Sequence, residues 1–156
     1  LDHDATHDPL TGLLNRRSFD DLLEQALARS RRYGWSFSLV MLDLNAFKAL
    51  NDRHGHVAGD QVLARIGGVL RSSMRAGDVA ARIGGDEFAV LLSRSDDAAA
   101  HLLASRVSSV INSELAWAGV AFSVGVATAP TESVDADALY RLADARLYEA
   151  KAGSRG

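Results

Sequence analysis

Three carboxylates stand where strands are expected to end, and their types and spacing could do chemistry. Asp43 follows residues 37–42, a short apolar run without breakers that predicts a buried strand. Asp86 and Glu87 follow Gly84-Gly85 between two strand-like runs, which predicts a β-hairpin with an acidic tip and with glycines free to adopt positive φ. If the two elements are neighbours, the acids converge at one edge of a sheet. Carboxylates beside a substrate phosphate are ligands that Mg²⁺ prefers.

Each acid taken alone has a simpler interpretation as a solvated cap or turn residue, because acidic side chains are mostly exposed. The two glycines before Asp86 argue for more, since they leave room for a ligand to approach the backbone. The combination favours a metal and phosphate site over three unrelated caps.

The rest of the chain predicts the elements that must position these acids. Asn15 is suited to cap a helix that ends near Tyr33, before Gly34. Apolar spacing predicts further helices at about 59–74, around inward-facing Leu103, Val107, Val110 and Ile111, and at about 135–150, with strands at 37–42, 79–83, 88–92 and 122–127. Helices and strands alternate without a regular βαβ rhythm, so we expect an α/β sandwich around a mixed or antiparallel sheet.

The composition describes one globular domain and excludes several function classes. The 156 residues are 47% apolar and 24% charged, which suits a single core and excludes a mostly disordered chain. No apolar run reaches the roughly 18–20 residues of a membrane span, and no secretory signal is visible. The chain has no Cys, which excludes disulfides and thiolate sites and fits a reducing cytoplasm. A formal charge of −3 argues against a general nucleic-acid binder.

Five stretches, in chain order, resemble the GGDEF family of diguanylate cyclases. The most specific is Arg82-Ile83-Gly84-Gly85-Asp86-Glu87-Phe88, which contains the family's five-letter motif intact. The others are residues 8–17, 43–60, 123–127 and 143–151, which read DPLTGLLNRR, DLNAFKALNDRHGHVAGD, SVGVA and ADARLYEAK. The resemblance covers roughly residues 8 to 155.

This resemblance implies an α+β fold similar to nucleotidyl cyclases and polymerase palms, with a mixed antiparallel sheet of about five strands flanked by helices. It makes residues 8–156 the catalytic domain and residues 1–7 a residual N-terminal linker. The implied activity condenses two GTP molecules into cyclic di-GMP and two pyrophosphates across a homodimer of half-sites. The alternatives are a catalytically inactive domain that binds GTP or cyclic di-GMP and controls a linked signalling module, and a related cyclase for another nucleotide.

Matching the motifs residue by residue assigns roles within the site. Asp86 and Glu87 are the expected catalytic acids, and the sequence does not separate the metal ligand from the base. Mg²⁺, or Mn²⁺ in its place, is expected on Asp43, Asp86 and the backbone carbonyl of Leu44. The resemblance assigns guanine to Asn51 and Asp60, and the phosphates to Phe47, Lys48, Lys151 and Arg155.

Two of these assignments have chemical support of their own. A carboxylate such as Asp60 accepts from guanine N1–H and the exocyclic amine together, and leaving it unpaired would cost an ATP complex about 1–3 kcal/mol. The chain holds 15 Arg but only two Lys, and both Lys48 and Lys151 fall at phosphate positions, which favours a compact charge there. The structural alternatives are that Asn51 ends a helix, that Asp60 caps the next, and that the lysines fell there by chance.

Arg75 and Asp78 match the family's inhibitory site for its product. Arginine pairs with a guanine edge or a phosphate, and aspartate accepts from guanine, so the pair suits cyclic di-GMP. The chain departs from the family pattern at Asn45, which replaces an acid, and at Gly153, which stands one place early before Arg155.

The expected partners are GTP, cyclic di-GMP, a second copy of the chain and an N-terminal sensor or stalk domain. The resemblance and the charge predict no nucleic acid and no direct membrane contact by this domain. A cytoplasmic location is expected, in a longer protein that could itself be anchored to a membrane.

Overall fold

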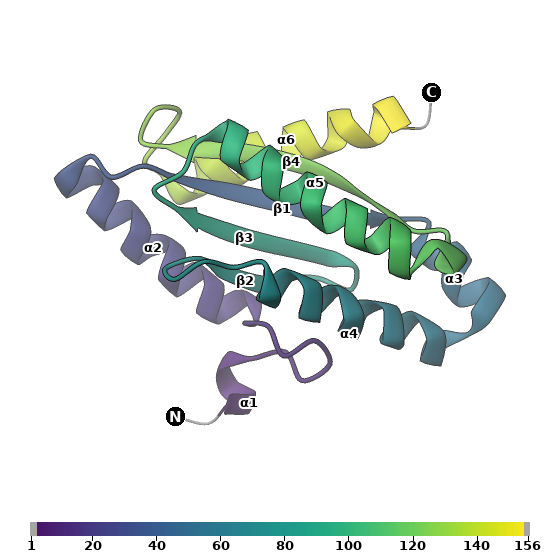
Figure 1. The fold of residues 1–156 in the computed structure, drawn as a ribbon. Helices are drawn as coiled ribbons and strands as arrows, with labels where there is room; N and C mark the ends of the chain where they lie inside the picture. Colours follow the sequence, from purple (N-terminus) through teal and green to yellow (C-terminus); the bar gives the residue numbers. More distant parts are fainter. Residues whose placement is uncertain (1–2, 155–156) are drawn as a thin grey trace.

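A four-stranded antiparallel sheet forms the centre of the molecule in the computed structural model, which describes residues 3–154 (Figure 1). In spatial order the strands are β2 (Val79–Arg82), β3 (Glu87–Ser93), β1 (Phe37–Asn45) and β4 (Ala121–Ala129). They are the four apolar runs that the sequence predicts as strands. The expected total of about five is one too high for the described residues, because beside β2 the chain forms only an isolated bridge, between Leu14 and Ala81, and no fifth strand.

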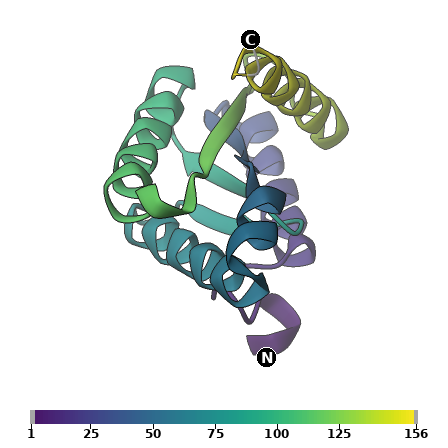
Figure 2. The same ribbon diagram turned by 90° about the vertical axis from the view of Figure 1, so that its right-hand side faces the viewer.

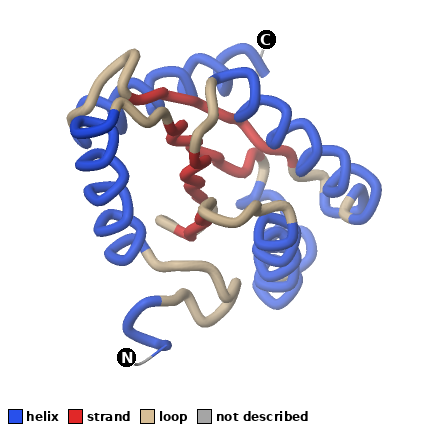
Figure 3. Tube along the Cα trace, turned by 60° about the vertical axis from the view of Figure 1, so that its left-hand side comes forward, coloured by secondary structure: helices blue, strands red, loops and turns tan. Residues whose placement is uncertain are grey.

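Helices cover both faces of the sheet, as Figures 2 and 3 show. One face carries α2 (Arg16–Tyr33) and α6 (Ala136–Ser154), and the other carries α4 (His56–Ser72) and α5 (Asp97–Glu114). The shorter segments are α1 (His3–Thr6), α3 (Phe47–His54) and the 3-10 helix η1 (Ala116–Ala118). None of the described helices combines the length and the apolar content that crossing a membrane requires.

Alternation along β1 sends its side chains into two separate hydrophobic cores. Leu39 and Met41 pack with α2 and α6, whereas Val40 and Leu42 pack with α4 and α5. Because helices cover both faces, β1 reads as a continuous apolar run. Asp43 continues the alternation of Leu39 and Met41, so its carboxylate belongs to the face that α2 and α6 cover.

Local signals define α2 as expected. The Oδ1 atom of Asn15 accepts a hydrogen bond from the backbone N–H of Ser18 at 3.0 Å. Gly34 ends the helix in the left-handed region, with φ 70° and ψ 17°.

The expected start of the next helix near residue 59 is wrong. α4 begins at His56, and α3 precedes it without having been predicted. The two helices meet at Gly55, whose φ of 89° is readily available only to glycine. Gly59 lies inside α4, where a Cβ would stand only 1.9 Å from the Oδ1 atom of Asn51. Its missing side chain therefore lets α3 and α4 approach closely.

A second close approach sets the position of α6. A Cβ on Gly125 of β4 would lie 2.0 Å from the backbone oxygen of Ala143 and 2.5 Å from the backbone nitrogen of Leu147. The absence of a side chain therefore lets α6 lie directly on the sheet. This packing determines where Lys151, near the end of α6, reaches the sheet.

Candidate active site

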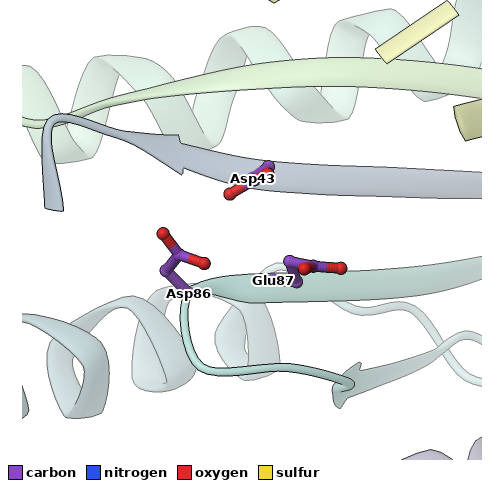
Figure 4. Close-up of side chains that lie close together, drawn as sticks. All are labelled: Asp43, Asp86 and Glu87. Carbon is purple, nitrogen blue, oxygen red and sulfur yellow. The ribbon is translucent and has the colours of Figure 1, made fainter. Parts of the chain in front are cut away.

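The three predicted carboxylates lie together at one end of the sheet (Figure 4). Asp43 and Glu87 are register partners on β1 and β3, and the backbone carbonyl of Asp86 accepts a hydrogen bond of 3.1 Å from the N–H of Leu44. One oxygen from each carboxylate lies within 4.8 Å of the others. Antiparallel pairing of β1 with β3 therefore assembles an acidic cluster from two distant parts of the chain.

This acidic cluster has unsatisfied negative charge. The Nζ atom of Lys151 lies 2.9 Å from Oδ2 of Asp43, and both side chains are largely buried. The Oδ1 atom of Asp43 is buried and has no hydrogen-bond partner within the described chain. Burial, and after it the charge of Asp43, raises the pKa of both Asp86 and Glu87. A buried oxygen without a donor, among carboxylates that repel one another, fits a divalent cation.

Arg82 shapes the turn that precedes the acids. Its guanidinium donates hydrogen bonds to the carbonyls of Gly84 and Gly85, at 3.2 and 2.9 Å. Neither glycine has a positive φ, so that expectation is wrong: the turn is held by Arg82 and needs no left-handed residue. A Cβ on Gly85 would meet nothing within 4 Å, whereas a Cβ on Gly84 would stand 3.2 Å from the side chain of Glu87, so open space is found at Gly85 and not at Gly84.

The chain turns sharply from β1 into α3 beside the acidic cluster. Ala46 adopts the left-handed region, with φ 65° and ψ 21°, although it is not glycine. Backbone strain of this kind concentrates at functional sites. Phe47, the first residue of α3, packs partly buried against the core, while Lys48 is exposed. Because of this sharp turn, α3 begins at Phe47, only four residues after Asp43.

Asn51 and Asp60 are brought to one place by the α3–α4 packing. The Oδ1 atom of Asn51 is buried, has no hydrogen-bond partner among the described residues and lies against Gly59, the residue before Asp60. Asp60 is exposed. Asn51 lies inside α3 and Asp60 inside α4, so the alternative in which they end and cap helices is wrong. Asn51 therefore packs against the residue before Asp60, and the carboxylate of Asp60 is open to solvent.

Comparison with known proteins decides the family. The family model described as "Diguanylate cyclase, GGDEF domain" matches residues 5–156. The chain belongs to the GGDEF-domain family. Diguanylate cyclase DgcS of Shewanella oneidensis is 45% identical over 153 residues, covering 97% of this chain and 51% of that protein. Cyclic di-GMP phosphodiesterase NbdA of Pseudomonas aeruginosa is 37% identical over 155 residues, covering 97% of this chain and 20% of that protein.

The fold of this GGDEF domain matches solved structures as well. The coiled coil and GGDEF domain of DgcB from Caulobacter crescentus, in complex with c-di-GMP, superposes with a TM-score of 0.87 at 33% identity. The match covers 97% of this chain and 83% of that one. The chain spans about half of DgcS and a fifth of NbdA, so it corresponds to one part of these curated relatives.

In this GGDEF domain, Asp78 holds Arg75, the other residue of the predicted inhibitory site. Its side chain is 1% exposed and accepts from the Nε atom of Arg75 at 3.1 Å and from the backbone N–H of Ser93 at 2.9 Å. Arg75 is 61% exposed, so its guanidinium is presented to solvent in a fixed position. A surface cavity is lined by Arg75, by Asp78 and also by Arg106 of α5. The sequence analysis missed Arg106 because no motif spacing connects it to Arg75.

The N-terminal motif of the GGDEF domain is tied to the hairpin. Oδ1 of Asp8 lies 3.2 Å from Nη1 of Arg82, and Oδ2 accepts from the hydroxyl of Thr11 at 2.7 Å. Burial alone would raise the pKa of Asp8, but the hydrogen bonds from Thr11 and the charge of Arg82 hold that pKa below its ordinary value. The N–H of Leu14 also donates to the carbonyl of Ala80 on β2, at 3.2 Å. Sequence reasoning did not foresee this link.

The two departures from the family pattern have different outcomes. The Nδ2 atom of Asn45 donates to the Oγ atom of Ser123 at 2.9 Å, so this amide connects β1 to β4 where an acid could not donate. Arg155 lies outside the described residues, and its assignment to phosphate stays a prediction.

Proposed function

We propose that this GGDEF domain is a diguanylate cyclase, which joins two GTP molecules into cyclic di-GMP and releases two pyrophosphates. The observation that carries the proposal is the cluster of Asp43, Asp86 and Glu87, with oxygens within 4.8 Å of one another beside Lys151. The family match and the similarity to DgcS support the same activity.

Asp43 and Asp86 would hold Mg²⁺, or Mn²⁺ in its place, with the backbone carbonyl of Leu44 beside them. The unpartnered Oδ1 of Asp43 is the kind of hard oxygen donor that such cations take. When bound, the metal stabilises charge on the phosphate, attacking and leaving oxygens. Lys151 would then exchange its contact with Asp43 for a contact with phosphate.

The start of α3 would hold the triphosphate. Backbone N–H groups in the first turn of a helix lack intrahelical partners and bind phosphate, which suits Phe47 and Lys48. Lys151 and, by resemblance, Arg155 would add positive charge from the end of α6. The open space at Gly85 leaves room for phosphate oxygens at the hairpin turn.

Asn51 and Asp60 would select guanine. The exposed carboxylate of Asp60 can accept from guanine N1–H and from the exocyclic amine, and the amide of Asn51 can pair with another polar atom of the base. An adenine base leaves Asp60 without donors, which predicts ATP binding about 10- to 100-fold weaker than GTP binding.

The reaction requires two copies of the domain because each holds one GTP. The 3′-oxygen of one GTP forms a bond to the α-phosphorus of the other, the α–β phosphoanhydride bond breaks, and pyrophosphate leaves. The reciprocal step closes the ring. The proton of each 3′-hydroxyl passes to Glu87 or Asp86, and burial together with the charge of Asp43 raises the pKa of Glu87, which strengthens it as a proton acceptor.

Cyclic di-GMP would inhibit the enzyme by binding at Arg75 and Asp78. The fixed, exposed guanidinium of Arg75 and the nearby Arg106 provide donors for guanine and phosphate. DgcB, which was crystallised with c-di-GMP, supports binding of this ligand by the fold. We also propose a cytoplasmic setting and an N-terminal sensor or stalk domain, with no nucleic-acid partner.

The test is incubation with GTP and Mg²⁺, followed by chromatography for cyclic di-GMP and an assay for pyrophosphate. We expect both products from the unaltered domain, and a loss of at least about 100-fold in Asp86→Asn. Asp21→Asn, which changes an exposed aspartate of α2, should keep the original rate. A domain that binds GTP or cyclic di-GMP but forms no product would be an inactive regulatory domain and would overturn the proposal.

A further inference from the structure

The helix α3 depends on few contacts with the rest of the domain. It has eight residues, and the chain turns sharply at both ends, with φ 65° at Ala46 before it and φ 89° at Gly55 after it. Its one buried residue, Leu50, lies in the first half of the helix. Because helices this short are marginal in water on their own, the position of α3 is set by its tertiary contacts.

The last turn of α3 is exposed, and a ring contact joins it to another element. In the part of the chain that the structure describes, the side chains of Asp52, Arg53 and His54 make no hydrogen bond and no ion pair. The ring of His54 instead packs edge to face on Trp117 of η1, with centroids 5.4 Å apart and planes at 89°. This is a favourable geometry for two aromatic rings.

Trp117 stands on a segment that is itself fixed in the core. Leu115 before it and Ala118 after it are buried in the same core cluster as Leu50. Figure 1 shows the end of α5, which leads into η1, beside α3. The side chain of Trp117 is 50% exposed, so it lies on the surface and reaches His54 from a fixed backbone.

The turn that Trp117 contacts belongs to the proposed guanine site. His54 follows Asn51 by three residues, so the two side chains are neighbours on one face of α3. The backbone carbonyl of Asn51 accepts a hydrogen bond of 2.8 Å from the N–H of Gly55, which closes the same turn. The Oδ1 atom of Asn51 lies where Gly59 has no room for a Cβ. A small shift of α3 would therefore move Asn51 relative to α4.

We propose that Trp117 is a positioning residue for the guanine site, which holds the end of α3 through His54 and so fixes Asn51 for the base. The inference rests on the proposed function, because that function assigns guanine to Asn51. The contact acts on α3, whereas the acidic cluster lies on β1 and β3. Its loss should therefore weaken the binding of a guanine nucleotide and leave the chemical step nearly unchanged.

The experiment compares the unaltered domain with Trp117→Ala, Trp117→Phe, His54→Ala and the double variant of Trp117→Ala with His54→Ala. The control is Trp35→Ala, which removes the other tryptophan, 43% exposed and packed on Tyr33 with centroids 5.1 Å apart. Amide hydrogen exchange is measured over residues 47–54 without nucleotide. Titration in Mg²⁺ gives the affinities for non-hydrolysable analogues of GTP and ATP, and initial rates give kcat and KM. If Trp117→Ala does not fold, His54→Ala tests the same contact.

We expect Trp117→Ala to speed exchange in α3 and to weaken binding of the GTP analogue about three- to tenfold, the range that one aromatic pair contributes. Binding of the ATP analogue should weaken less, and kcat should stay within about twofold. Trp117→Phe keeps a ring and should stay within about twofold in affinity. His54→Ala should match Trp117→Ala, the double variant should lose no more, and Trp35→Ala should change none of these values.

The proposal is overturned if exchange in α3 is unchanged, if faster exchange leaves the affinity for the GTP analogue intact, if both analogues lose affinity equally, or if the two single losses add. Absence of cyclic di-GMP from the unaltered domain would instead refute the proposed function, while hydrogen exchange and analogue binding still test the role of Trp117.

Discussion

Replacing Asp86 with asparagine should stabilise the metal-free domain while removing its activity. The oxygens of Asp43, Asp86 and Glu87 lie within 4.8 Å of one another, and two unit charges at that separation repel by about 0.9 kcal/mol even in water. Asp86 has two such neighbours, so its charge costs about 2 kcal/mol. Attraction to Lys151 and Arg82 offsets part of this cost, which leaves a net gain of about 1 kcal/mol for Asp86→Asn.

Thermal unfolding in EDTA at pH 7 measures this gain. For a domain of this size, about 1 kcal/mol corresponds to a rise in Tm of about 2–4 °C. Asp21→Asn, the exposed control, should leave Tm unchanged. Mg²⁺ should then reverse the order: at ten times its Kd it adds about 1.4 kcal/mol to the original protein and much less to Asp86→Asn. A fall in Tm for Asp86→Asn in EDTA, or an undiminished response to Mg²⁺, would refute the reasoning.

The same measurement has a defined pH dependence. The native pKa values of Asp86 and Glu87 are raised above their ordinary values of 3.8 and 4.5, so the native state holds these protons more tightly than the unfolded chain. Their contribution to stability is complete below pH ~4 and is lost as pH rises through the raised values. Asp86→Asn should therefore show a smaller loss of unfolding free energy over this range in EDTA.

Three further substitutions test other parts of the account. Gly85→Ala should keep Tm within about 2 °C but weaken GTP binding at least about tenfold, since only a ligand would meet the new Cβ. Gly125→Ala places a Cβ against the backbone of α6 and should lower Tm by about 5–10 °C, whereas Gly68→Ala, which has ordinary space in α4, should raise it slightly. Arg75→Ala should relieve inhibition by micromolar cyclic di-GMP in a turnover assay, and unchanged inhibition would remove Arg75 and Asp78 from the product site.

Local patterns in the sequence were enough to locate the strands and the best-capped helix. Both the apolar runs and the pair formed by Asn15 and Gly34 act within a few residues, so they are legible without tertiary structure. The meeting of Asp43 with Glu87 also followed, because it needed only that the two strands pair. α3 was missed because eight residues around Leu50, its one buried residue, show too little apolar periodicity.

The remaining features depend on contacts between distant residues. Asp8 and Arg82 stand 74 positions apart, and nothing in either motif shows that one holds the other. The sequence suggested left-handed backbone at Gly84 and Gly85, which the structure does not have. The guanidinium of Arg82, which donates to their carbonyls and holds the turn, could not be inferred from spacing. Asp78 could not be recognised as a buried anchor, since its burial comes from Ser93 of β3 as well as from Arg75.

The most direct test of the central claim locates the metal. Crystals of the domain grown with a non-hydrolysable GTP analogue and MnCl₂ would reveal manganese by its anomalous scattering. We predict a peak in contact with carboxylate oxygens of both Asp43 and Asp86 and with phosphate oxygens of the analogue. Manganese bound elsewhere, or an analogue held without metal at these two acids, would contradict the account.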